Sequence, residues 1–378
     1  MSRSVWRWST VRVGFATCLV LGTLAGCSHK SDAIWIGVVA MLNDVDGSER
    51  NLRGVRVAVD EANAAGGIQG RQVEIRILRD SGLGETAVRV AQAFVTDNRI
   101  VAVLGHEFSS AMLAAAPLYD GNLAAVSTAS SPLLTGISPW VFRVVTSDSV
   151  LGTDEARLFA ARGWRRIAIL YVNDVYGRGL VGSFIPAFRA RGGEVVSRNP
   201  IPDNASDFQV YFRAFDNSLP DAVFVICGPS EAASFLRAAA KHHLRAQVIG
   251  GDGWGESLEK NPAAAEGVVW PASYAASDTQ PAAVEFRRVY FARYNEQPDA
   301  VSALAHDAAQ SVLEAIRRGG ATRAGVRSAL AAPGLLVTGT TGPIAFQHGE
   351  RVGGVGGLMR MVHGRLTMDQ RWDEVRRP

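Results

Sequence analysis

Several side chains able to hold a small charged molecule stand just after apolar runs of the sequence. Ser109 follows the run 100–104 and begins a stretch with helical spacing, residues 109–119. In open α/β sheets, ligands bind at the carboxyl ends of strands and near the N-termini of helices. The Ser109 hydroxyl and the neighbouring backbone N–H groups could therefore hold a carboxylate, helped by the helix dipole. The alternative is that Ser109 only caps its helix, as serine commonly does.

A carboxyl group and a phenol stand in similar places further along the chain. Asp252, between two glycines, follows the run 247–249 and could pair with an ammonium group. Aspartate beside glycine is otherwise a common turn residue. Tyr176 lies in the segment 173–177 and could place its ring over a ligand, or it packs as a loop aromatic against its own surroundings. The Ser/Thr-rich segment 127–131 is compatible with a plain turn or with a binding loop.

Short apolar runs alternate with amphipathic stretches from residue 34 onward, which is typical of parallel sheets covered on both faces by helices. The runs expected to form strands are 34–40, 73–78, 100–104, 123–127, 167–172, 194–197, 222–227, 247–249 and 267–269. The stretches with helical spacing are 51–65, 85–97, 109–119, 148–162, 177–191, 206–217 and 230–243. The predicted fold class is therefore α/β.

The alternating elements fall into two blocks, residues 33–146 and 148–270, followed by a helical block, 281–331. Helices without strands cannot complete a sheet, so the third block is expected to pack back onto one of the first two. Residues 335–378 have strand and turn patterns only. A chain that crosses several times between two α/β lobes is suited to closing around a ligand.

The N-terminal residues have the features of a secretory signal. Three arginines precede an apolar stretch, 13–24, within the ~7–15 residues of a signal-peptide core and too short for the ~20 residues of a membrane span. The following residues, Leu24-Ala25-Gly26-Cys27, resemble the lipobox of bacterial lipoproteins. That resemblance implies a signal peptide at 1–26, acylation of Cys27 and attachment to a membrane through this lipid, with 27–33 as a tether. Ser28 resembles a signal for the outer membrane.

Charge and cysteine content exclude several classes of protein. Removal of residues 1–26 takes away three arginines and leaves 36 basic and 36 acidic residues. We expect no nucleic-acid partner, because no basic run with interleaved aromatics is present. Cys227 would be the one thiol left beside Cys27, and its apolar surroundings favour burial over reactivity. We expect no enzyme activity, metal or cofactor, since nucleophile-elbow, zinc and redox motifs are missing, and we expect His106 to satisfy a backbone group.

Several short segments, in order, resemble the periplasmic solute-binding proteins of the leucine/isoleucine/valine type, the receptors of ABC importers. The segments that carry the resemblance are 36–39, 63–70, Asp80, 103–106, 109–110, 127–135, 142–143, 176–177 and 250–253. The family fold consists of two doubly wound, Rossmann-like lobes joined by three hinge segments. The resemblance implies that lobe one comprises 31–147 and 273–343, and lobe two 148–272 and 344–378.

The resemblance also implies a set of ligand contacts. Ala129 and Ser130 match positions that contact the carboxylate and ammonium of an amino acid, and Ser109, Tyr176 and Asp252 join them as ligand-binding residues. The chain departs from the family where the ligand side chain lies: the loop 41–51 is shorter, lacks its usual aromatic and carries charged residues. An aliphatic ligand is therefore not implied. Phe108 and Trp254 could supply aromatic surface, or they simply pack.

The sequence thus predicts an extracytoplasmic lipoprotein that binds a small amino acid or amide between two lobes and delivers it to an ABC permease. A ligand sensor of the same fold, reporting to a regulator, is the alternative. A purely structural lipoprotein would have its cleft filled by side chains.

Overall fold

The computed structural model describes Met1 and residues 33–371, apart from 42–47, 256–257, 259–261, 276 and 353–355. Cys27 lies outside the described residues, as does the predicted signal peptide, 1–26, apart from Met1. Two seven-stranded sheets dominate the chain, each built mainly from parallel strands. The predicted α/β class is confirmed.

The first sheet has the strand order β13-β14-β5-β4-β3-β1-β2. Its centre is parallel, because β1 pairs in parallel with both β2 and β3, and β4 pairs in parallel with β3 and β5. The strands are β1 (Ile34–Met41), β2 (Val73–Asp80), β3 (Ile100–Leu104), β4 (Ala124–Ser127), β5 (Val141–Arg143), β13 (Phe346–Gln347) and β14 (Glu350–Arg351).

The second sheet has the order β16-β15-β10-β9-β8-β6-β7, with a parallel part and an antiparallel edge formed by β10, β15 and β16. Its strands are β6 (Arg166–Val172), β7 (Glu194–Ile201), β8 (Ala222–Ile226), β9 (Gln247–Gly250), β10 (Val269–Ala272), β15 (Gly357–Val362) and β16 (Arg365–Arg371). A short separate pair is formed by β11 (Val337–Gly339) and β12 (Gly342–Ile344).

Helices cover both faces of each sheet, which explains the continuous apolar runs of the central strands. On β3, Ala102 and Leu104 face one core, with α1, α10 and α11, while Ile100 and Val103 face another, with α2 and α3. Helices α4 and α5 cover one face of the second sheet, and α6 and α7 cover the other. The helices are α1 (Ser48–Ala64), α2 (Gly84–Thr96), α3 (Ser109–Tyr119), α4 (Asp148–Ala161), α5 (Val175–Arg189), α6 (Gln209–Ser218), α7 (Pro229–His242), α9 (Pro281–Tyr294), α10 (Ala300–Gly319) and α11 (Arg323–Leu330).

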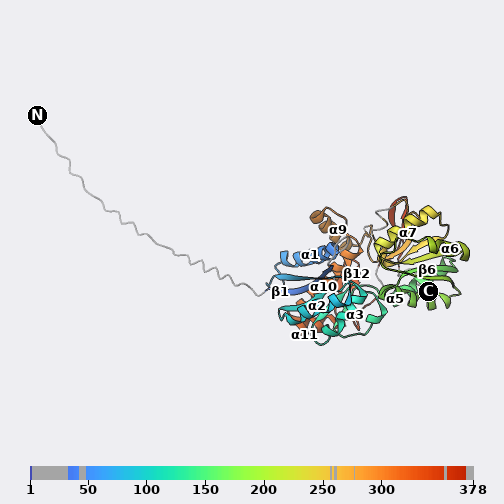
Figure 1. Ribbon diagram of the computed structural model, residues 1–378. Coiled ribbons are helices and arrows are strands. Elements are labelled where there is room, and N and C mark those ends of the chain that lie inside the picture. Colours follow the sequence, from blue (N-terminus) through green and yellow to red (C-terminus); the bar gives the residue numbers. More distant parts are fainter. Residues whose placement is uncertain are drawn as a thin grey trace. The chain divides into compact units, whose positions relative to one another are not determined.

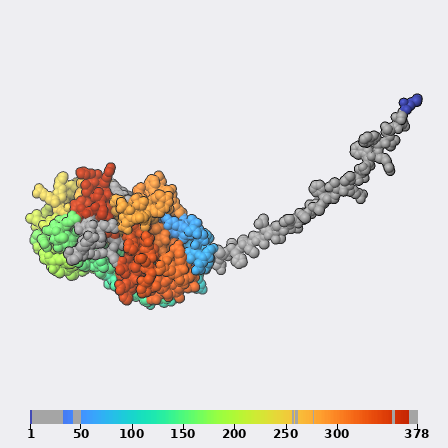
Figure 2. Space-filling model, turned by 180° about the vertical axis from the view of Figure 1, so that it is seen from behind, coloured from blue at the N-terminus to red at the C-terminus, as the bar shows by residue number. Residues whose placement is uncertain are grey.

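The third helical block packs onto the first sheet, as its lack of strands predicts. Helix α10 lies along α1, and α11 contacts α10 and β3. Figure 1 shows α1, α10 and α11 grouped around the first sheet, and in Figure 2 the orange surface of the third block adjoins the blue surface of α1. Among the described residues, no helix has the length and apolarity needed to cross a membrane.

The last crossing between the sheets comes later than the predicted boundary at 343/344. Strands β13 and β14 belong to the first sheet, where Glu350 pairs with Arg143 of β5. The reason is electrostatic as well as geometric: the Arg143 guanidinium donates to both carboxylate oxygens of Glu350, at 2.5 and 2.7 Å. The first lobe therefore keeps the chain as far as Arg351, and the second sheet resumes at β15.

Candidate functional site

Ser109 is the first residue of α3 and follows the carboxyl end of β3, as its position in the sequence predicts. Its side chain is buried, and its hydroxyl oxygen accepts a hydrogen bond from the backbone N–H of Ser131 at 3.2 Å. The N-cap position belongs to Phe108, which makes no side-chain cap. Ser109 therefore does not act as a simple cap for its own helix; it joins the start of α3 to the neighbouring loop, residues 128–131.

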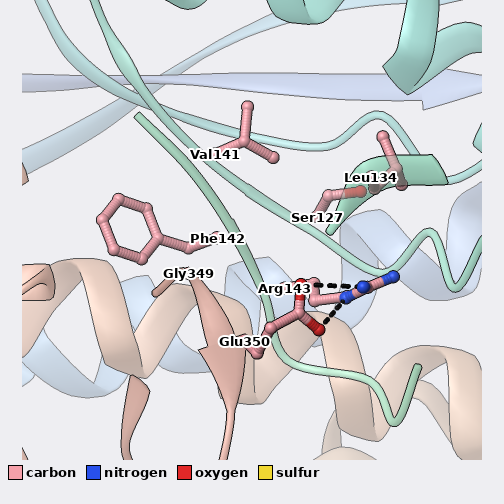
Figure 3. Close-up of a pocket in the computed structure, with 7 residues that line it drawn as sticks. All are labelled: Ser127, Leu134, Val141, Phe142, Arg143, Gly349 and Glu350. Atoms are coloured by element: carbon pink, nitrogen blue, oxygen red, sulfur yellow. Dashed lines mark hydrogen bonds and ion pairs between the residues drawn. The ribbon is translucent and has the colours of Figure 1, made fainter. Parts of the chain in front are cut away.

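Arg143 holds the 128–131 loop in place through hydrogen bonds. Its Nη1 donates to the carbonyl oxygens of Ser130 and Ser131, at 2.9 and 2.8 Å, while the rest of the guanidinium is held by Glu350 and Thr135. Figure 3 shows the Arg143–Glu350 pair at the wall of a small cavity, of about 10 Å³, which has room for a water molecule and not for an amino acid. A buried, bidentate arginine makes the loop a rigid element.

Further contacts place the individual loop residues. The Ala129 N–H donates to the Ser127 hydroxyl at 3.0 Å, and the Ser127 hydroxyl donates to the backbone carbonyl of His106 at 2.5 Å. Both Ala129 and Ser130 are buried. The His106 ring contacts side chains: Nδ1 lies 2.5 Å from an Asp80 carboxylate oxygen, and Nε2 lies 2.9 Å from the Tyr119 hydroxyl. The prediction that His106 satisfies a backbone group is wrong, because its ring contacts the side chains of Tyr119 and of the buried Asp80, at the end of β2.

A second acid, Glu107, precedes Ser109 by two residues. Asn51 of α1 donates to its carboxylate at 3.2 Å. Burial, together with the negative charges of Asp299 and Asp80, raises the pKa of Glu107 to about 7. Neutral and charged forms of Glu107 therefore coexist near neutral pH.

In the second lobe, Tyr176 and Asp252 contact each other directly. The Tyr176 hydroxyl donates to a carboxylate oxygen of Asp252 at 2.6 Å. Tyr176 lies in the first turn of α5, not in a loop, because Asp174 caps this helix by accepting from the Gly177 N–H at 2.7 Å. Asp252 opens the short 3-10 helix η2 (Asp252–Trp254) after β9. A Cβ at residue 251 would stand 2.8 Å from the Tyr176 hydroxyl, so a larger residue there would displace the Tyr176 side chain.

Asp148, the first residue of α4, connects the second lobe to the 128–131 loop of the first lobe. Its backbone N–H donates to the Ser130 carbonyl at 2.9 Å, and its side chain is buried. Helix α5 also contacts α3 and the 3-10 helix η1 (Pro132–Leu134) of the first lobe. At Gly179 of α5, a Cβ would meet the Pro132 ring at 2.8 Å.

Burial and mutual repulsion raise the pKa values of the acidic groups gathered here. Burial, and then the charge of Asp252, raises the pKa of Asp148 well above its ordinary value, and the same two causes act on Glu155 of α4. Burial raises the pKa of Asp252, although the hydrogen bond from Tyr176 opposes this. Burial and the charge of Asp252 raise the pKa of the Tyr176 hydroxyl as well. The cluster thus carries more acidic groups than it can easily ionise together.

The two aromatic candidates lie in different surroundings. Phe108 is 44% exposed and packs beside Gly82 at the start of α3. Trp254 is fully buried in the core of the second lobe, against Phe235 and Gly250. Cys227 lies in the same core as a free thiol, and burial raises its pKa, as the apolar run before it predicts.

Hydrogen bonds join Ser109 to the 128–131 loop, which contains Ala129 and Ser130, and join that loop to Asp148. Tyr176 and Asp252 form a second hydrogen-bonded pair, and Asp252 acts on Asp148 through its charge. Sequence reasoning did not assign roles to Arg143, Asp148 or Glu155. Arg143 stands inside one of the segments that carry the family resemblance, which is a usable signal, whereas the two acids lie in an ordinary amphipathic helix. No group of three His, Cys, Asp or Glu side chains in the described part of the chain is placed to hold a metal ion.

Two α/β lobes with helices on both sheet faces, and polar groups gathered where the strand ends of the lobes meet, define a two-lobed small-molecule-binding protein. The sequence model of the periplasmic binding protein family matches residues 39–362. The chain belongs to this family, and the relatives that it matches are described as binding proteins, not as enzymes.

Individual relatives agree with this assignment. The chain is 26% identical over 263 residues to an amino acid binding protein of Pseudomonas aeruginosa, covering 67% of this chain and 68% of that protein. It is 29% identical over 257 residues to the leucine-specific-binding protein of Salmonella typhimurium, covering 66% and 68%. Among solved structures, an ABC transporter substrate-binding protein of Desulfitobacterium hafniense in complex with Leu matches with a TM-score of 0.78 and 27% identity, over 89% of this chain and 99% of that chain.

Proposed function

We propose that this chain binds a free amino acid or a small amide between its two lobes and delivers it to an ABC importer. The observation that carries the proposal is the meeting, at one place, of hydroxyl and backbone donors from the first lobe with carboxylates from the second. An amino acid needs both, because its carboxylate requires donors and its ammonium group requires acceptors. Relatives described as amino acid and leucine binding proteins support the choice of ligand class.

The ligand carboxylate would bind at the start of α3 and at the 128–131 loop. The N-terminus of a helix attracts anions through its free N–H groups and its dipole. The buried Ser109 hydroxyl stands at this terminus. Arg143 holds Ser130 beside it, and the Ser127 hydroxyl holds Ala129. Rigid donors are effective because little entropy is lost when they bind the ligand.

The ligand ammonium would bind to Asp252, with Asp148 close by. An opposite charge favours the ionised form of a buried carboxyl, so the ammonium group would lower pKa values that burial now raises. Tyr176 orients the Asp252 carboxylate through its 2.6 Å hydrogen bond. Phe108 would flank the ligand side chain, and Trp254 would support the Asp252 turn from the core.

Acylation of Cys27 would attach the protein to a membrane, facing the periplasm or the cell exterior. The six residues of the tether after Cys27, 28–33, span at most ~20 Å when extended, at ~3.3–3.6 Å per residue. The lobes would therefore work close to that membrane. A closed, ligand-bound form would be presented to the permease, because only the closed form makes contacts from both lobes to one ligand.

A thermal-shift screen of the chain from Ser28 onward, against the common amino acids and short aliphatic amides, tests the proposal. We expect at least one compound to raise the melting temperature in a concentration-dependent manner, since a ligand that binds only the folded state stabilises it by mass action. If none of these compounds shifts the melting temperature at millimolar concentration, the amino-acid and amide assignment is refuted.

A further inference from the structure

Glu155 is a buried acid that the proposed binding of an α-amino acid does not use. It lies on α4 two turns after Asp148, and its side chain is fully buried. Among the described residues, neither of its carboxylate oxygens has a hydrogen-bond partner. Native proteins rarely leave a buried polar group without a partner, because the lost hydration is not replaced. Such a group beside Asp148 and Asp252 calls for a partner that is not part of the chain.

Asp148 is in a similar position. Both of its carboxylate oxygens are buried without a hydrogen-bond partner in the described residues, although the Ser130 side chain is near enough to favour its ionised form. Asp148 stands at the lobe boundary, since its N–H binds the Ser130 carbonyl and its carboxylate faces Gly179 of α5. A ligand held by Ser130 therefore lies beside Asp148.

The charges around Glu155 are all of its own sign. After burial, the groups that act on it are Asp252, Asp148 and Asp154. Asp154 is engaged elsewhere, 3.6 Å from Arg157. Among these acids, Asp148 is affected by the positive charge of Arg143. The Arg143 guanidinium already binds Glu350 and two backbone carbonyls. The acids thus lack an equivalent positive charge in the described part of the chain.

A metal ion does not fit this arrangement, because no three acidic, histidine or cysteine side chains in the described ranges converge on one point. The spacing suits an extended organic cation. Asp148 and Glu155 are seven residues apart on α4, and at ~1.5 Å per residue their backbones are separated by ~10 Å along the helix axis. A molecule with two positive groups joined by a chain of four or five atoms could reach both ends.

We infer that the ligand of this chain is a basic amino acid, whose α-ammonium group binds Asp252 and Asp148 and whose side-chain cation binds Glu155. The inference rests on the proposed function and narrows its substrate class from amino acids in general to those with an amino or guanidino side chain.

Calorimetric titration of the chain from Ser28 onward tests the inference with two pairs of probes. L-Lysine and L-norleucine have side chains of similar length, and only lysine has the terminal amine; L-ornithine and L-norvaline form the second pair. We expect each basic amino acid to bind at least tenfold more tightly than its neutral partner. Equal or weaker binding of the basic members would overturn the inference while leaving the proposed function intact, whereas no binding of any amino acid or amide would refute the proposed function itself.

A variant locates the side-chain cation. Glu155→Gln should reduce the preference for lysine over norleucine at least tenfold and change norleucine affinity less than threefold. The matched control is Glu231→Gln, which removes another buried acid of the second lobe, one that accepts from the Asn204 N–H at 2.7 Å; it should leave the preference unchanged. An unchanged preference in Glu155→Gln would overturn the assignment of Glu155. The wild-type comparison needs no variant, so it stands even if Glu155→Gln fails to fold.

Proton release gives a second readout. Because burial raises the pKa values of Asp148 and Glu155, cation binding should ionise them and release protons. The enthalpy of lysine binding should therefore differ between phosphate and Tris buffers, which have different ionisation enthalpies, and the difference should be smaller in Glu155→Gln. Equal buffer dependence in the two proteins would count against Glu155 as the cation's partner.

Discussion

A single methyl group at residue 179 should weaken ligand binding by keeping the lobes apart. Gly179 lies on α5, a helix of the second lobe that contacts α3 and η1 of the first lobe. A Cβ there would stand 2.8 Å from the Pro132 ring carbon Cδ, and 3.5 and 3.6 Å from the side-chain oxygens of Ser131 and Asp148. The last two distances are ordinary contacts, so the conflict is with the proline ring alone.

The size of the effect follows from that overlap. Carbon atoms in contact are normally ~3.5–4.0 Å apart, so Gly179→Ala requires the lobes to separate by up to about 1 Å. Introducing a methyl group into a packed interface costs about 1–3 kcal/mol. If the ligand binds the closed form, this cost reduces affinity by about 5- to 150-fold. The unfolding temperature of the ligand-free protein should change little, because each lobe keeps its own core.

Calorimetry with the best ligand from the screen measures the effect, and Gly182→Ala is the matched control. Gly182 is on the same helix, and a Cβ there would meet nothing within 4 Å. Both substitutions gain the same helix propensity, up to ~1 kcal/mol, so their difference isolates the contact with Pro132. Equal affinities in Gly179→Ala and Gly182→Ala would refute the argument that binding requires this closed arrangement.

Three further predictions concern Arg143, Glu107 and Cys27. Arg143→Lys breaks the pair with Glu350 and frees the 128–131 loop, so it should lower the free energy of unfolding, measured by urea titration, by about 3–5 kcal/mol. The control is Arg288→Lys, at an exposed pair, which should change the free energy of unfolding by less than ~1 kcal/mol. Glu107→Gln should stabilise the protein relative to wild type by about 1–3 kcal/mol at pH 8 and by little at pH 5. The sign follows from the raised pKa, because the folded state favours protonated Glu107. The stability that protonated Glu107 contributes to wild type is lost as pH rises from about 4.5 through about 7. Parallel curves of unfolding free energy against pH for wild type and Glu107→Gln would contradict this prediction. Cys27→Ser should abolish labelling of the protein by radioactive palmitate in cells, and labelling that persists would exclude Cys27 as the acylated residue.

The sequence predicts the framework of this protein well, for reasons that are local. A run such as 222–227 is apolar at every position because it is buried on both faces, and alternation of such runs with helical stretches indicates a parallel sheet. The third helical block could be assigned to a lobe only in part, because packing partners are not encoded locally. The crossing after residue 343 was misplaced for a related reason: β13 and β14 have two residues each, too few to form a pattern.

Some residues of the candidate site could be predicted from the sequence, and others could not. Ser109 and Asp252 follow strand ends, so their location could be predicted from the rule for open α/β sheets. Asp148 and Glu155 could not, because an acid on an amphipathic helix normally faces solvent, and only tertiary packing buries these two. The pairing of His106 with Asp80 depends on a contact across 26 residues, which no local pattern reveals.

The central claim is that the ligand binds between the two lobes, at Asp252. It is tested most directly by calorimetric titration of wild type and Asp252→Asn with an amino acid that wild type binds. Asparagine keeps the hydrogen bond from Tyr176 and removes the charge that would pair with the ligand ammonium. We expect one site per wild-type chain, affinity reduced at least tenfold in Asp252→Asn, and little change in Glu231→Gln. Binding that is as tight in Asp252→Asn as in wild type would contradict the site between the two lobes described above.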